Sequence, residues 1–190
     1  MPTARAKTIA HHVTLPKRAE RIIYTGLLPR APSTRRDGVE RNLRKIFDEE
    51  KPKSIQQSQT NSLFLHPGEI RGLNYREFAF ETEIGNNALV ADAQIFRHAL
   101  VKAKAGLNER KLRELARKYW SHTITLGEFQ KYYSKNIRDY VRNNSAPATM
   151  PQKIGIPEIL YPHKIEPAKL EGGGYIKLAK RKEAKSKEKK

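Results

Sequence analysis

A net charge of +18 on 190 residues limits how large a folded core this chain can build. Only 37% of the residues are hydrophobic and the mean hydropathy is −0.76, so we expect a modest core and segments that have none. Repulsion among so many cations opposes a compact state unless a polyanion supplies the countercharge. The composition therefore predicts a nucleic-acid partner.

Missing residue types and motifs exclude several classes of protein. The chain has no cysteine, which excludes a disulfide framework, cysteine-ligated zinc and thiol nucleophiles, and which is compatible with a reducing or mitochondrial interior. No stretch approaches the roughly 20 apolar residues that span a bilayer, so we expect no membrane span. The six histidines show no metal-ligand spacing, and no acid–base pair or nucleophile stands out. We therefore expect no enzyme activity, cofactor, metal or small-molecule substrate.

The charge is distributed in blocks along the chain. Residues 1–36 carry 8 basic and 1 acidic side chains, and residues 97–142 carry 12 basic and 4 acidic. Residues 164–190 carry 10 basic and 4 acidic side chains, whereas residues 37–96 carry 7 basic and 10 acidic. This pattern predicts a neutral to acidic element between basic faces.

The first 33 residues are expected to form a basic extended arm, because four prolines interrupt any helical periodicity. An apolar patch between Ile22 and Leu28 is too short to fold alone and should dock on another surface. The charge pattern of residues 1–36 is typical of a mitochondrial targeting segment, and a basic arm that only contacts a polyanion is the alternative. The predicted location is the mitochondrial matrix, with the cytoplasm or nucleus as alternatives.

Residues 34–51 are predicted to form an amphipathic helix and residues 52–85 a loop with a possible strand. The helix has four residues on one apolar face: Val39, Leu43, Ile46 and Phe47. Between residues 74 and 84, apolar residues and Thr82 alternate with acids, which favours a half-buried strand. A helix remains open there, because a lone strand needs a partner and only Ser62–Leu65 is a plausible one.

Residues 86–143 are predicted to form a three-helix core. Asn86 or Asn87 caps the first helix, Gly106 ends it in the left-handed conformation, and Asn108 caps the second. An apolar stripe that begins at Leu126 defines the third helix over four turns. The predicted fold class is therefore mainly α, a small bundle of three to four helices with a possible short β-hairpin and long extended N- and C-terminal arms.

The C-terminal part changes character twice. Residues 144–174 contain five prolines and a Gly172–Gly174 run, which predicts an extended strap laid along a surface. Residues 175–190 form a lysine-rich tail that we expect to be disordered alone.

Four groups of cations are predicted to contact RNA phosphates. One group consists of four residues that share one face of the third helix over roughly 16 Å, a spacing that matches several phosphates: Lys131, Lys135, Arg138 and Arg142. Tyr132 lies off the apolar stripe and is predicted to stack on a base. The complete set is Arg5, Lys7, Lys17, Arg18, Arg21, Arg30, Arg35, Arg36, Arg110, Lys111, Arg113, Arg117, Lys118, Lys131, Tyr132, Lys135, Arg138, Arg142, Lys180, Arg181 and Lys182. A solvated face of an ordinary helix is the alternative for each helical cluster.

Two further patterns leave alternatives open. The acids Asp48, Glu49 and Glu50 at a predicted helix end are interpreted as a solvated helix end, with a weak cation site or a contact for a basic neighbour as the less favoured alternatives. The second and third predicted helices also permit a helix-turn-helix interpretation. Because the entry positions of that motif, Leu126 to Gln130, carry no cation, an ordinary helical hairpin is favoured.

A small helical body with a basic arm, a proline-rich strap and a lysine tail resembles a ribosomal protein, in general type the lineage-specific proteins of mitochondrial ribosomes. The resemblance covers the whole layout and rests on no motif. It implies a non-catalytic structural component of a ribonucleoprotein that binds ribosomal RNA through phosphates and neighbouring ribosomal proteins through apolar patches. The alternatives are a DNA-binding regulator or nucleoid protein that uses the helical hairpin, and an assembly or accessory factor of a mitochondrial complex.

Overall fold

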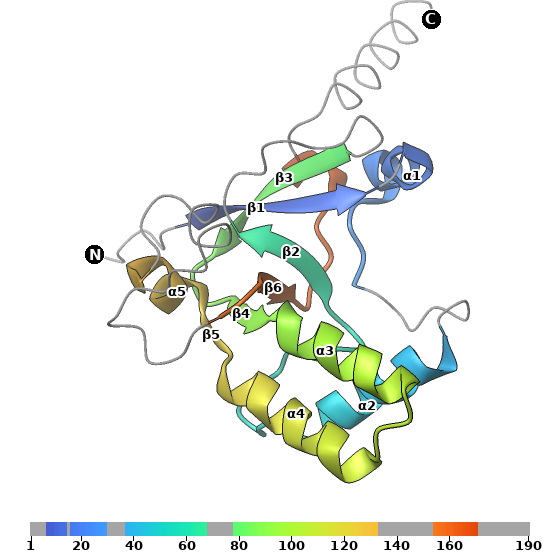
Figure 1. The fold of residues 1–190 in the computed structure, drawn as a ribbon. Coiled ribbons are helices and arrows are strands. Elements are labelled where there is room, and N and C mark those ends of the chain that lie inside the picture. Colours follow the sequence, from blue (N-terminus) through green and yellow to red (C-terminus); the bar gives the residue numbers. More distant parts are fainter. Residues whose placement is uncertain (1–6, 15, 30–36, 68–77, 133–153, 171–190) are drawn as a thin grey trace, which may run out of the picture.

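A computed structural model describes residues 7–14, 16–29, 37–67, 78–132 and 154–170. The described strands form a six-stranded sheet in the order β3-β1-β2-β6-β4-β5, with every pair antiparallel (Figure 1). The strands are β1 (Lys7–Thr14), β2 (Leu63–Pro67), β3 (Phe78–Gly85), β4 (Leu89–Asp92), β5 (Ile124–Thr125) and β6 (Pro157–Tyr161). The helices are α1 (Pro16–Thr25), α2 (Gly38–Glu49), α3 (Ala93–Lys104), α4 (Glu109–Ser121) and α5 (Leu126–Tyr132), with a 3₁₀ turn, η1 (Pro167–Lys169).

The prediction of a mainly α fold is wrong, because the sheet makes this an α/β fold. The N-terminal segment, expected to be an extended arm, contains β1 and α1. Strand β1 pairs with β3 along its whole length, from Lys7 opposite Gly85 to Thr14 opposite Phe78. Burial along β1 does not follow the apolar character of its residues, since Ile9 is 52% exposed while His11 is buried. Pairing with a distant strand therefore determines its conformation.

The proline-rich segment, expected to be an extended strap, supplies a central strand. Strand β6 pairs with β2 on one side and β4 on the other. Pro157 is its first residue and Pro162 follows its last, so the prolines bound the strand and do not interrupt it. Ile159 and Leu160 are fully buried and belong to two different hydrophobic clusters, which shows that β6 has a core on each face.

The alternation between residues 74 and 84 does form a strand over the described part, β3. Phe80, Thr82 and Ile84 are buried while Glu83 is exposed, as the alternation predicts. Its described partner is β1, whereas Leu63–Pro67 pairs with β1 and β6. Strand β2, which the sequence suggested as the partner of β3, is therefore separated from β3 by β1.

Among the helices, α2 and α4 agree with prediction and α3 starts later than predicted. Leu43, Ile46 and Phe47 of α2 are buried as expected. Asn108 caps α4 by accepting from the Lys111 N–H at 3.1 Å. Gly106 adopts the predicted left-handed conformation, with φ of 81°. Helix α3 is capped by Asp92 and not by Asn86 or Asn87, because the residues before it form β4.

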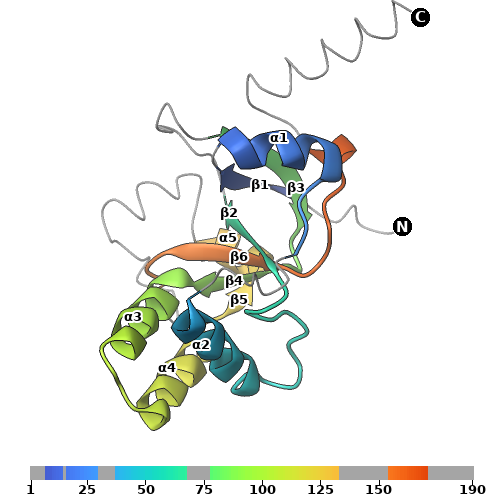
Figure 2. The same ribbon diagram turned by 90° about the vertical axis from the view of Figure 1, so that its right-hand side faces the viewer.

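Two clusters of side chains pack on opposite faces of the sheet. Helices α2, α3 and α4 form a layer near β4 and β6, where Phe47 contacts Phe96 and Tyr119 with ring centroids 5.1 and 5.3 Å apart. Helix α1 lies beside β1 and β3, far from that layer (Figures 1 and 2). The described helices include none with the length and apolar character to cross a bilayer.

Backbone hydrogen bonds next to Gly26 join the end of α1 to the C-terminal segment. The apolar patch that begins at Ile22 docks here, since Leu27 is buried and exchanges backbone hydrogen bonds of 2.9 Å with Ile165. Gly26 has φ of 74°, and a Cβ there would lie 2.2 Å from the Ile165 carbonyl oxygen. Only glycine fits this turn, and the turn fixes α1 relative to the sheet.

Candidate nucleic-acid interface

The acidic end of α2 contacts basic residues of α4. The Arg113 guanidinium pairs with Glu49 at 2.7 Å, Glu50 at 3.0 Å and Glu109 at 2.7 Å, and Arg117 pairs with Glu50 at 3.0 Å. Hydrogen bonds to Glu50, Glu109 and Glu49 raise the pKa of Arg113. The favoured interpretation of a solvated helix end is therefore wrong for Glu49 and Glu50, and the alternative of a contact for a basic neighbour is confirmed. Two of the predicted RNA contacts are thus engaged within the protein.

The third acid of that cluster holds a loop. Asp48 accepts hydrogen bonds from the backbone N–H of Gln59 at 2.6 Å and from the N–H and hydroxyl of Thr60 at 3.1 and 2.6 Å. The loop in turn presents Gln59 to the core, where its side-chain amide donates to the Tyr119 hydroxyl. Asp48 therefore has a structural role.

The aromatic residues near the predicted cations lie largely in the core. Tyr119 and Trp120 are 0% and 3% exposed, and the Trp120 indole N–H donates to the Phe47 carbonyl. Burial raises the pKa of Tyr119. Tyr132, predicted to stack on a base, is half-buried and packs against the cluster that contains Leu126 and Phe129. This packing restricts its access to a ligand.

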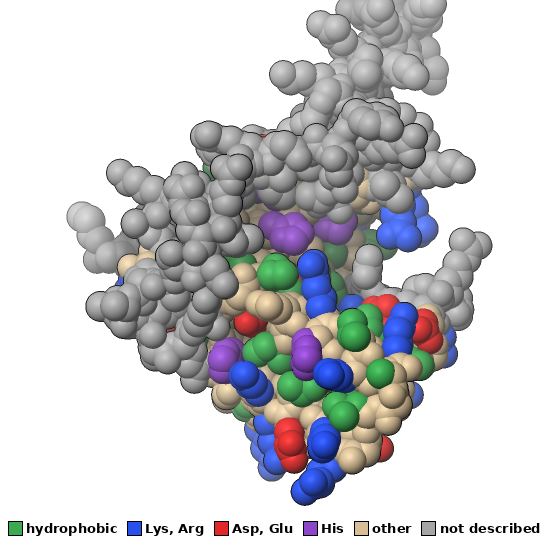
Figure 3. Space-filling view, in the orientation of Figure 1, with side chains coloured by type: hydrophobic (Ala, Val, Ile, Leu, Met, Phe, Trp, Pro, Cys, Tyr) green, Lys and Arg blue, Asp and Glu red, His purple; other side chains and the backbone are tan. Residues whose placement is uncertain are grey.

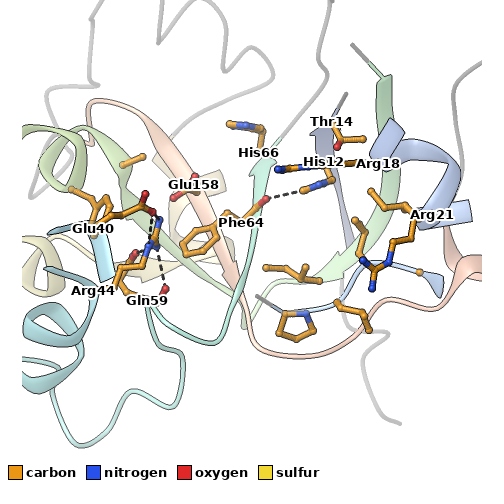
Figure 4. A pocket seen from close by; sticks show the side chains of 18 of the residues that line it. His12, Thr14, Arg18, Arg21, Glu40, Arg44, Gln59, Phe64, His66 and Glu158 are labelled. Atoms are coloured by element: carbon orange, nitrogen blue, oxygen red, sulfur yellow. Dashed lines mark hydrogen bonds and ion pairs between the residues drawn. The ribbon is translucent and has the colours of Figure 1, made fainter. Parts of the chain in front are cut away.

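A cleft of about 880 Å³ lies between α1 on one side and α2 and α3 on the other. Strands β1 and β2 contribute His12, Phe64 and His66 to it, as Figure 4 shows from close by. In the space-filling view, histidine side chains lie above the helical layer with basic side chains near them (Figure 3).

Three arginines from two helices line this cleft. Arg18 and Arg21 lie three residues apart on α1, on the same face, and Arg97 lies on α3. All three side chains are exposed, and none forms an ion pair with another described residue. The cleft therefore gathers positive charge that the described acids do not neutralise.

A fourth arginine in the cleft is neutralised by its surroundings. The Arg44 guanidinium donates to Glu40 Oε1 at 2.8 and 2.9 Å and to the Gln59 carbonyl and side-chain oxygens at 3.1 and 2.7 Å. It also lies 4.5 Å from the ring centre of Phe96 and 5.0 Å from that of Phe64. These contacts make Arg44 a cation–π element of the wall, and its ion pair with Glu40 joins two residues at i,i+4 spacing on α2.

The histidines of the cleft are held by the sheet. His12 Nδ1 lies 3.4 Å from the Phe64 carbonyl. Burial lowers the pKa of His66, and the charges of Arg97 and His11 act in the same direction. His66 is therefore neutral at pH 7, so the three unpaired arginines supply the positive charge.

The remaining predicted contacts are dispersed or lie outside the described residues. Arg110, Lys111 and Lys118 are exposed on α4, and Lys131 is exposed at the end of α5, away from the cleft. Lys7 and Lys17 fall in β1 and α1. The residues outside the described part are Arg5, Arg30, Arg35, Arg36, Lys135, Arg138, Arg142, Lys180, Arg181 and Lys182. Sequence reasoning missed Arg97, because no periodic or compositional signal connects a single exposed arginine of α3 with α1.

The start of α5 is occupied by contacts within the protein. The backbone N–H groups of Leu126 and Gly127 donate to the carbonyls of Ala88 and Asn86 at 2.7 and 2.9 Å. Thr125 and Glu128 form a capping box, with the Thr125 N–H and hydroxyl donating to Glu128 at 2.9 and 2.8 Å. In a helix-turn-helix protein these positions face base edges, whereas here they bond to the turn that precedes β4 and to their own cap. The arrangement gives no support to the helix-turn-helix interpretation.

No protein-family model, curated protein or solved structure matches this chain. In the described ranges, no group of three or more potential ligand side chains is arranged to hold a metal ion. The functional assignment therefore depends on the geometry and charge of the chain itself.

Proposed function

We propose that this protein is a non-catalytic, RNA-binding component of a ribonucleoprotein, with a mitochondrial ribosomal subunit as the assembly to test first. The observation that carries the proposal is the convergence of Arg18, Arg21 and Arg97 on one cleft without an acidic partner among the described residues. The net charge of +18 supports the same class of partner.

Arginine suits a phosphate ligand because its planar fork of N–H donors binds two phosphate oxygens at once. The chain neutralises Arg44 and Arg113 with its own carboxylates, but it leaves the three cleft arginines unpaired among the described residues. Three unpaired guanidinium groups that line one cleft concentrate positive charge there, and a bound polyanion neutralises it. We therefore expect RNA binding to weaken steeply as salt rises, because the release of counterions from the RNA then contributes less free energy to binding.

The proposal is tested by sedimentation of the tagged full-length protein from fractionated cells, with and without ribonuclease. We expect the protein to migrate with one ribosomal subunit and to shift to the top of the gradient after ribonuclease treatment. Migration with a protein complex that is insensitive to ribonuclease would favour the accessory-factor alternative. RNA affinity that stays constant between low and moderate salt would also contradict the proposal.

A further inference from the structure

We propose that the cleft holds an unpaired nucleotide of a single-stranded RNA segment, with one flanking phosphate on Arg18 and Arg21 of α1 and the other on Arg97 of α3. This inference rests on the proposed function and specifies the form of RNA that the protein prefers. It is argued from the size of the cleft, from the distribution of charge in it and from the conformation that each form of RNA presents.

The size of the cleft fits a small ligand. Its volume of about 880 Å³ lies within the range of about 300–1,000 Å³ that is usual for pockets enclosing one small molecule. A duplex keeps its bases stacked inside and presents phosphates on a convex surface, so it reaches only the rim of such a cleft. A single strand can turn one nucleotide out of its path and insert it.

The charge in the cleft is asymmetric, which orients a nucleotide. Arg18 and Arg21 form the α1 side, whereas Glu40 and Glu158 lie on the side of α2 and β6 (Figure 4). Because Glu40 is paired with Arg44, its side of the cleft offers a phosphate little attraction, whereas Arg18 and Arg21 attract it. The charge of Arg97 also acts on the β2 side of the cleft, where it helps to lower the pKa of His66.

Apolar surface between the two polar ends provides room for a base. Phe64 lies in Figure 4 between the Glu40–Arg44 pair and Arg21. Ile22 and Leu28 from the α1 side and Leu100 from α3 also line the cleft. A base placed against these groups would leave water at the same time as its phosphate meets the arginines.

The experiment compares a short single-stranded RNA with the duplex of the same sequence, both fluorescently labelled, using the full-length protein. The test variant is Arg18→Gln with Arg97→Gln, and the control is Lys45→Gln with Lys102→Gln. The control also removes two positive charges from exposed positions, and neither lysine lines the cleft. Thermal unfolding of each variant establishes that it folds.

We expect the wild-type protein to bind the single strand more tightly than the duplex. The test variant should lose about tenfold in affinity for the single strand and little for the duplex. Its salt dependence, the slope of log K against log salt, should decrease by about 1.4, since each lost phosphate contact accounts for about 0.7. The control should keep the wild-type preference. Crosslinking of thiouridine-substituted RNA to the wild-type protein should map to the peptide that contains Phe64 and His66.

Three outcomes would contradict the inference, and they are distinguishable from one another. If RNA binds but the test variant behaves as the control does, the cleft is not the site and the proposed function stands. If the full-length protein binds neither RNA, the inference and the proposed function both fail. If adenosine monophosphate competes at the affinity of the oligonucleotide, and the test variant loses both equally, the occupant is a free nucleotide.

Discussion

At the scale of single residues, the availability of an arginine depends on which acids the fold brings to it. Arg113 and Arg117 were predicted as RNA contacts from a local excess of cations. Their partners Glu49 and Glu50 lie more than 60 residues earlier in the chain. Local charge counting could not detect this neutralisation, and it selected Arg18 and Arg21, which have no ion-pair partner in the described chain, on the same basis.

Arg113→Gln tests the structural role of this residue. The change leaves Glu49, Glu50 and Glu109 close together without their shared cation, so we expect the melting temperature to decrease by a few degrees at low salt. The decrease should become smaller as salt screens the carboxylates. RNA affinity should change no more than in Lys45→Gln. Thermal unfolding and anisotropy measure the two effects, and Arg110→Gln, an exposed position on the same helix, is the stability control.

His66 gives the folded protein a specific pH dependence. Its pKa is lowered in the folded state from the ordinary value of 6.5, so the unfolded chain binds a proton more readily. Stability should therefore decrease as pH falls below 6.5, until the folded-state pKa is passed. His66→Gln should reduce that decrease, while His163→Gln, at an exposed position, should not. Urea denaturation midpoints over a pH series test this, and equal slopes in both variants would contradict it.

At the scale of elements, one carboxylate joins a helix to a strand. Asp92 is 5% exposed and accepts hydrogen bonds from the N–H groups of Gln94 at 2.9 Å, Gly155 at 2.8 Å and Ile156 at 3.0 Å. It thus caps α3 and also fixes the backbone that leads into β6. No sequence pattern links residues 92 and 155, because the contact exists only in the folded sheet.

Asp92→Ala should destabilise the protein by about 2–4 kcal/mol, since it leaves three N–H groups without an acceptor. Asp92→Asn keeps one acceptor oxygen and should recover part of the loss. Chemical denaturation measures both free energies of unfolding. A loss in Asp92→Ala as small as that expected for an exposed site would show that Asp92 does not hold this junction.

The elements that could be predicted are those with a local signal. Helices α2 and α4 have apolar faces and caps within their own sequences, and β3 has a regular alternation. Strand β4 was interpreted as the first turn of a helix, because Leu89 shares helical spacing with Ala93 and Phe96. Strands β1 and β6 were missed because partners far along the chain provide their hydrogen bonds and much of their burial.

At the scale of the whole molecule, the candidate cleft depends on elements that are distant in sequence. Arg21 and Arg97, which are more than 70 residues apart in the sequence, line it from two different helices. The turn at Gly26 fixes α1 through the C-terminal segment. Total charge predicts a nucleic-acid ligand, which stays a prediction, and it indicates no position for a binding site. The position of a cleft is a property of the fold, which local patterns do not contain.

Removal of residues 1–14 tests whether the N-terminal segment is part of the fold. This deletion takes away β1, the strand between β3 and β2, so we expect loss of the cooperative thermal transition. Removal of residues 1–6 leaves every described strand in place and should preserve the transition. Retention of a wild-type transition in the longer deletion would mean that the segment is an accessory arm.

The position of β6 also has a consequence for synthesis of the protein. Because β6 alone bridges β2 and β4, the sheet cannot close until Pro157–Tyr161 has left the ribosomal exit tunnel. The nascent chain must therefore carry its earlier strands with unpaired edges for most of translation, which exposes them to chaperones and to pairing with other chains.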